Sequence, residues 1–127
     1  MKFTGREVFA IMGSLSAANS TKGQGRKFIR INKNRFSEAY GEIVGWAGDF
    51  EDDFDGITVQ KAPDNTVVSF QLDPENGKEA LEAFSKFLSD TDYEIEPYRM
   101  TEGVLDFIDG IDINQEGALM QLTTEAV

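Results

Sequence analysis

Residues 57–72, ITVQKAPDNTVVSFQL, predict a β-hairpin. Apolar and polar residues alternate on both sides of a central turn, which is typical of strands with one buried face. The turn, residues 63–65, reads Pro-Asp-Asn, in which proline restricts φ and asparagine tolerates a left-handed conformation. On the second strand, Val68, Phe70 and Leu72 alternate with residues 67, 69 and 71. The hairpin thus predicts antiparallel β-structure in the middle of the chain.

Before the hairpin, residues 4–17 predict an amphipathic helix. Thr4 and Glu7 have the spacing of a capping box. The stretch loosely imitates a secretory signal, but Glu7 and Gly13 interrupt that pattern. We therefore expect a mature helix in a cytoplasmic protein, and no run approaches the ~20 apolar residues that span a bilayer. The apolar residues at helical spacing are Val8, Ile11, Met12 and Leu15.

The segment between this helix and the hairpin gives mixed signals. Residues 19–25 have the polar, glycine-bearing composition of a loop. Residues 26–31 predict a short strand that ends in a turn. Residues 36–47 fit a helical stripe, although Gly41 and Gly45 each disfavour a helix by about 1 kcal/mol relative to alanine. We predict a helix there.

After the hairpin, the pattern predicts a helix and then a strand. Asp73, followed by proline, opens a helix whose inward stripe is Leu81, Phe84 and Leu88. Residues 93–98 predict a third strand.

The C-terminal part is less patterned. Thr101 can cap a short helix that runs to Ile108. Residues 114–127 leave two alternatives, a frayed tail or a segment that docks on a neighbour through residues such as Leu119 and Leu122. Together the elements predict one small α+β domain, with three to four helices packed on an antiparallel sheet of three to four strands.

Composition narrows the function classes. The 127 residues include no His and no Cys, so the chain lacks the usual general base near neutral pH, thiol nucleophiles and thiolate zinc ligands. Residues 51–56 resemble the first half of an EF-hand loop, but Ala62 stands where that loop needs a bidentate glutamate. We therefore expect no enzyme activity, no metal site and no cofactor.

Charge is distributed unevenly along the chain. Residues 1–36 hold eight bases and one acid, a net charge of +7, whereas residues 37–127 hold four bases and twenty-two acids, a net charge of −18. A field of a single sign attracts partners of opposite sign and raises association rates. Pairing between the two segments inside the fold would instead cancel this field.

The acidic residues suggest a binding surface. From Asp90 to Glu96 every even position is an acid. In a strand, these four carboxylates would share one face at intervals of about 6.6 Å, close to the separation of successive phosphates along a nucleic-acid strand. A second acidic cluster lies at residues 49–55, and its candidate apolar anchors are Trp46, Phe50 and Phe54. A third cluster comprises Asp106, Asp109 and Asp112. The predicted partner-binding residues are Asp49, Phe50, Glu51, Asp52, Asp53, Phe54, Asp55, Asp90, Asp92, Glu94 and Glu96.

Two functions of different classes fit this layout. The first is a non-enzymatic binding module whose acidic face docks on a basic, nucleic-acid-binding protein and inhibits or regulates it, by mimicking nucleic acid. The second is an assembly subunit, in which the basic N-terminal segment of one copy meets the acidic face of the next. Direct nucleic-acid binding is disfavoured by an isoelectric point near 4.3, and we expect no membrane contact. The candidate basic contacts are Lys22, Arg26, Lys27 and Arg30.

Overall fold

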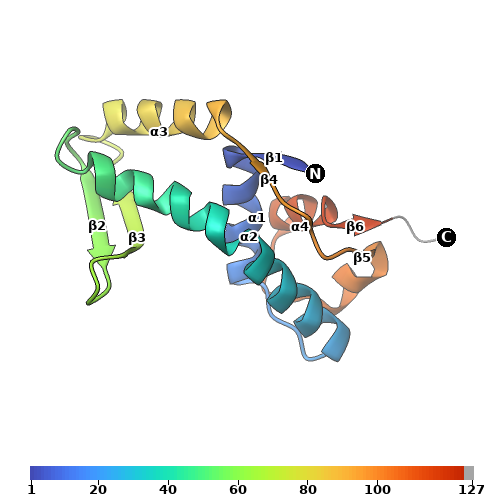
Figure 1. The fold of residues 1–127 in the computed structure, drawn as a ribbon. Coiled ribbons are helices and arrows are strands. Elements are labelled where there is room, and N and C mark those ends of the chain that lie inside the picture. Colours follow the sequence, from blue (N-terminus) through green and yellow to red (C-terminus); the bar gives the residue numbers. More distant parts are fainter. Residues whose placement is uncertain (125–127) are drawn as a thin grey trace.

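Helices make up most of the chain, and short strands lie between them. The computed structural model describes residues 1–124 (Figure 1). The predicted α+β class is confirmed. The elements are β1 (Lys2–Thr4), α1 (Gly5–Ala17), α2 (Gly23–Phe50), β2 (Ile57–Lys61), β3 (Val67–Leu72), α3 (Lys78–Asp90), β4 (Asp92–Glu94), β5 (Met100–Thr101), the 3₁₀ helix η1 (Glu102–Phe107), α4 (Ile113–Met120) and β6 (Thr123–Thr124).

The strands of the described chain form three separate pairs, which corrects the prediction of one antiparallel sheet of three to four strands. β1 pairs with β4 and β2 with β3, both antiparallel, whereas β5 and β6 are parallel. The pairs lie at three different places around the helices (Figure 1). The predicted strand over residues 93–98 is reduced to β4, because β1 offers only three residues for pairing.

The predicted hairpin is confirmed as β2–β3. Its register shifts between Gln60 and Lys61. Because of this bulge, Val68 points away from the core and is 59 % exposed, whereas Val67 is half-buried.

Helix α1 is also confirmed, with its capping box. The Glu7 N–H donates to Thr4 Oγ1 (3.1 Å) and the Thr4 N–H donates to Glu7 Oε1 (3.0 Å). All four apolar residues of the predicted stripe are buried.

The assignment of residues 19–34 as loop, strand and turn is wrong over most of its length. Helix α2 begins at Gly23 and continues without a break through the predicted strand at residues 26–31. The reason is that its buried side chains recur at helical spacing across the whole segment, so one stripe packs against α1 and η1. These buried side chains are Phe28, Ile29, Asn32, Phe36, Ala39, Ile43, Val44, Trp46 and Ala47.

Two glycines weaken α2 without serving its packing. A methyl group added at Gly41 or Gly45 would have no atom of another residue within 4 Å, once the helix's own backbone is set aside. We expect the double change Gly41→Ala/Gly45→Ala to raise the free energy of unfolding by about 1.5 kcal/mol, measured by urea denaturation. The matched control is Gly25→Ala, which should destabilise, because the new methyl would collide with Ser20 and approach the Phe107 carbonyl oxygen. A destabilised double variant would contradict this prediction.

Helix α3 starts later than predicted. The Asp73 carboxylate accepts hydrogen bonds from the Glu75 and Asn76 N–H groups (2.8 and 3.3 Å) and so holds a turn. These bonds lower the pKa of Asp73 below its usual value. The helix begins only at Lys78, and Leu81 is 51 % exposed, contrary to the predicted stripe. The buried residues of α3 are Ala80, Phe84 and Leu88.

Residues 114–124 are not a frayed tail, and the docking alternative is the correct one for them. Helix α4 begins at a capping box formed by Asp112 and Gln115. Leu119 and Leu122 are fully buried. Residues 125–127 lie outside the described part of the chain.

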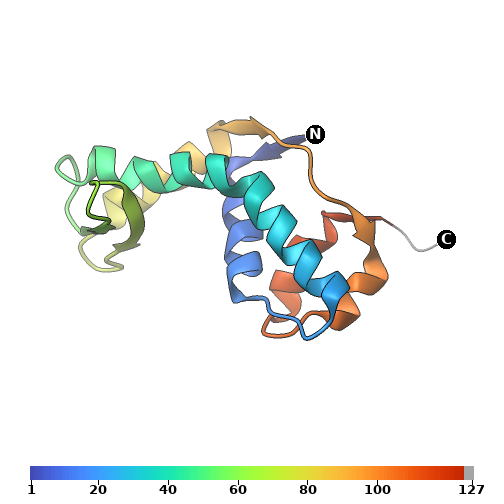
Figure 2. The same ribbon diagram turned by 60° about the horizontal axis from the view of Figure 1, so that its bottom comes forward.

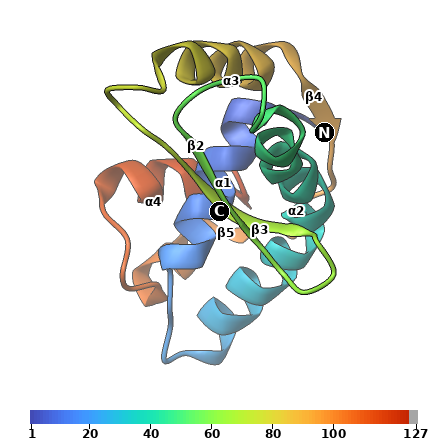
Figure 3. The same ribbon diagram turned by 90° about the vertical axis from the view of Figure 1, so that its left-hand side faces the viewer.

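The core surrounds α1, which lies between α2 and α4 (Figure 3). Phe3 of β1 and Phe36 of α2 are fully buried and pack edge to face, with ring centroids 5.1 Å apart. The helix predicted after Thr101 is the short η1, in which Val104 and Leu105 are buried and Phe107 is exposed. Figure 2 shows the hairpin at the C-terminal end of α2, away from α4. No helix within residues 1–124 combines the length and apolarity needed to cross a membrane.

Candidate functional site

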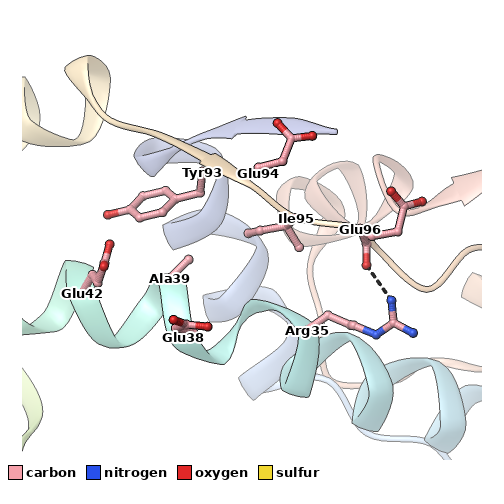
Figure 4. A pocket seen from close by; sticks show the side chains of 8 residues that line it. All are labelled: Arg35, Glu38, Ala39, Glu42, Tyr93, Glu94, Ile95 and Glu96. Atoms are coloured by element: carbon pink, nitrogen blue, oxygen red, sulfur yellow. Dashed lines mark hydrogen bonds between the residues drawn. The ribbon is translucent and has the colours of Figure 1, made fainter.

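Two hollows lie along one side of α2, where this helix runs next to α3 and β4. The first, the acidic groove, has a volume of about 340 Å³ and separates α2 from residues 93–96 (Figure 4). Glu38 and Glu42 extend from α2, while Glu94 and Glu96 belong to the facing segment. Acidic residues therefore belong to both sides of the groove, although the carboxylates of Glu94 and Glu96 point away from α2 (Figure 4). Its lining residues are Arg35, Glu38, Ala39, Glu42, Tyr93, Glu94, Ile95 and Glu96.

The facing segment keeps the predicted alternation of charge. Asp92, Glu94 and Glu96 are exposed, whereas the residues between them are half-buried or buried. This pattern extends beyond β4, because Ile95 continues to pack in the core after strand pairing ends. Asp90 does not belong to this row, since it is the last residue of α3. The row therefore has three carboxylates instead of the predicted four.

Direct bonds hold the facing segment against α2 and against the N-terminal residue. The Arg35 guanidinium donates to the Glu96 carbonyl oxygen (3.0 Å). The Met1 amino group lies 2.7 Å from Glu94 Oε1, and the hydrogen bond and charge of this ammonium keep the pKa of Glu94 below its usual value. Within residues 1–124 the carboxylates of Glu38, Glu42 and Glu96 form no ion pair.

Tyr93 reports on the charge inside the groove. Its ring points toward Glu42 (Figure 4), and burial, with the Glu42 carboxylate, raises the pKa of Tyr93 above 10.0. Because its folded-state pKa is raised, the protonated Tyr93 hydroxyl stabilises the folded protein below about pH 10. This contribution is lost as the pH rises through the folded-state pKa. Glu42→Gln should lower the Tyr93 pKa in an ultraviolet titration assigned with Tyr93→Phe. Glu38→Gln is the control; an equal shift in both variants would contradict a specific effect of Glu42.

The second hollow, the aromatic cleft, has a volume of about 390 Å³ and lies between the end of α2 and α3. The Trp46 ring centroid lies 5.3, 6.3 and 6.4 Å from those of Phe50, Phe54 and Phe87. Trp46 itself is only 6 % exposed, whereas Phe50 is 37 % exposed. The remaining lining residues are Ala83, Lys86, Asp90 and Thr91.

The groove and the cleft follow one line, which we call the acidic seam. Glu38, Glu42, Trp46 and Phe50 are four residues apart and so share one face of α2. On the other side, the chain passes directly from α3 into β4. From Arg35 to Phe50 the seam is about 22 Å long, at 1.5 Å per residue. The acidic residues along it are Glu38, Glu42, Asp90, Glu94 and Glu96.

The predicted cluster at residues 49–55, the acidic turn, borders the cleft. Phe50 and Phe54 line the cleft. Asp49, Asp52, Asp53 and Asp55 are exposed, whereas Glu51 pairs with Lys61 at 2.7 Å.

Folding does not cancel the charge asymmetry. Within residues 1–124 there are two ion pairs, Met1 with Glu94 and Lys61 with Glu51. The charges on α2 are arranged unfavourably for its helix dipole, because its N-terminal half carries bases and its C-terminal half carries acids. A helix gains stability from the reverse arrangement. These charges therefore do not serve the stability of the helix.

The bases gather in a separate basic groove of about 460 Å³. Arg26, Arg30 and Lys33 line it from α2, over an apolar floor that includes Ile29. Of the other predicted contacts, Lys22 does not line this groove, and the Lys27 ammonium lies over the Tyr98 ring, 5.6 Å from its centroid.

The sequence analysis missed Glu38, Glu42 and Tyr93 as site residues. Glu38, Glu42 and Trp46 follow one another at intervals of four residues. This spacing places them on one face only if residues 36–50 form a single helix. The third acidic group does not join the seam: Asp109 pairs with Asn19 through the backbone, and Asp106 lines a hollow beside α4.

No group of three or more acidic side chains within residues 1–124 is placed to hold a metal ion. No family model, no curated protein and no solved structure matches the chain.

Proposed function

We propose that this is a non-enzymatic binding protein whose acidic seam docks on a basic segment of a nucleic-acid-binding partner and thereby inhibits or regulates it. The observation that carries the proposal is the lack of internal pairing: the seam carboxylates face solvent, and only Glu94 among them has a cationic partner within residues 1–124. Such a surface attracts cations without first breaking an internal salt bridge.

The row of acids on the segment that borders the seam supports a partner that binds nucleic acid. In the extended segment Asp92, Glu94 and Glu96 recur at about 6.6 Å, twice the rise per residue. A partner whose cations are spaced to meet successive phosphates would meet carboxylates here at a similar spacing. Exposed charges of this kind contribute chiefly to association rate and specificity.

A displacement experiment tests the mimicry. The probe is a complex of double-stranded DNA with a lysine-rich peptide, followed by the fluorescence anisotropy of the labelled DNA. Adding an excess of the protein should release the DNA, and moderate salt should weaken the competition for the peptide. If the protein leaves the anisotropy unchanged at low salt, or raises it by binding DNA itself, the proposal is wrong.

The basic groove favours a second candidate function, assembly of identical copies. The groove and the acidic turn lie toward opposite ends of α2, so a contact between them would be heterologous and would build rings or filaments. Light scattering at low and moderate salt decides between the two functions. Assembly predicts a large species that dissociates as salt rises and is lost in Arg30→Gln/Lys33→Gln, whereas a salt-independent monomer excludes it.

A further inference from the structure

We infer that the aromatic cleft is an anchor site, and that the partner inserts a large apolar side chain there while flanking Lys or Arg residues meet the acidic turn. This inference rests on the proposed function and names the kind of segment that the seam recognises. It makes the partner a basic segment with one apolar anchor.

The cleft differs from the rest of the aromatic core. Phe3, Phe28 and Phe36 are completely buried, and Phe84 beneath the cleft is 5 % exposed. Phe50, in contrast, is 37 % exposed, and Phe54 and Phe87 are half-buried. These three rings surround a shallow, open hollow over Trp46, so an inserted apolar group would lie against aromatic side chains.

Charge around the cleft selects the occupant. Asp90 stands on one side and the acidic turn, with Asp49, Asp52, Asp53 and Asp55, on the other, all exposed. The one cation in the lining is Lys86. A basic segment would therefore be attracted by the acids around the cleft, whereas an acidic or neutral segment would not.

The apolar lining argues that an apolar group, not a cation, enters the cleft. Lys86 would repel a second ammonium at this position, whereas it leaves an aliphatic or aromatic group unaffected. In interfaces, a few buried aromatic or aliphatic anchors carry most of the affinity, and surrounding charges set rate and specificity.

Trp46 provides a direct readout, because it is the single tryptophan of the chain. The probes are a Lys/Ser peptide with one central Phe and the same peptide with Ser in place of Phe. We expect the Phe peptide to shift Trp46 emission and to bind about tenfold more tightly than the Ser peptide, the effect of one ordinary anchor. Phe50→Ser and, separately, Phe87→Leu should reduce this difference, while Asp52→Asn/Asp53→Asn/Asp55→Asn should weaken the binding of both peptides.

The outcomes separate this inference from the proposed function. Equal affinity of the Phe and Ser peptides overturns the anchor site but keeps an acidic docking surface. Binding of neither peptide overturns both. A Trp46 shift that depends on protein concentration alone identifies a second copy as the occupant and also overturns the inference.

Discussion

Replacing Asn32 by leucine should lower the free energy of unfolding by about 3 kcal/mol, because the N–H and carbonyl groups of the half-buried Tyr98 would lose their side-chain partner. Asn32 is fully buried in α2. Its Nδ2 donates to the Phe28 and Tyr98 carbonyl oxygens (both 3.0 Å), and its Oδ1 accepts from the Tyr98 N–H (2.9 Å). Leucine fills a similar volume but satisfies none of these groups.

The Asn32→Leu change should also loosen the acidic groove. Asn32 ties α2 to the chain just beyond Glu96, which lines the groove. Urea denaturation measures the loss of stability, and Asn34→Leu is the matched control, because Asn34 is exposed on the same helix and its side chain makes no hydrogen bond within residues 1–124. If Asn32→Leu and Asn34→Leu unfold at the same urea concentration, the role assigned to Asn32 is wrong.

The triple variant Glu38→Gln/Glu42→Gln/Glu96→Gln should weaken binding of a lysine-rich peptide by roughly thirtyfold. Each exposed charge pair contributes up to about 1 kcal/mol, and three pairs at about 0.7 kcal/mol each amount to about 2 kcal/mol. Within residues 1–124 the Glu38 and Glu96 carboxylates hold no other element, since Glu96 uses only its backbone oxygen, and glutamine at position 42 can still face the Tyr93 hydroxyl. The stability of this variant should therefore match that of the parent.

The control for this variant removes the same number of charges elsewhere. Glu102, Asp106 and Glu116 line a different hollow, between η1 and α4. The variant Glu102→Gln/Asp106→Asn/Glu116→Gln should retain binding within about threefold, because it changes only the long-range field. If both triple variants lose affinity equally, the net charge, not the seam, attracts the peptide.

Local patterns in the sequence were sufficient where an element depends on its own residues. The capping box of α1 and the Pro-Asp-Asn turn of the hairpin act within a few positions, and both predictions are confirmed. The start of α2 was different. Gly25 and Asn32 look like turn residues, yet Gly25 is required by the close approach of Ser20 and Asn32 by the Tyr98 backbone. Both reasons are tertiary and invisible in a local pattern.

Local patterns likewise predicted only part of the candidate site. Phe50 and Phe54 were chosen because they stand among acids, and they do line one cleft. The groove, however, depends on α2 and residues 93–96 lying side by side, a contact across more than fifty positions. The sequence therefore indicated clusters of exposed acids, whereas the place where the acids of two elements meet required the fold.

The most direct test of the central claim is an amide chemical-shift titration of the isotope-labelled protein with a lysine-rich peptide. The acidic seam predicts that the largest shifts occur at Glu38, Glu42 and residues 93–96, decrease with added salt, and are small at residues 102–116. Shifts that are largest at residues 102–116, or uniform over the acidic surface, would contradict the claim that the seam is the binding site.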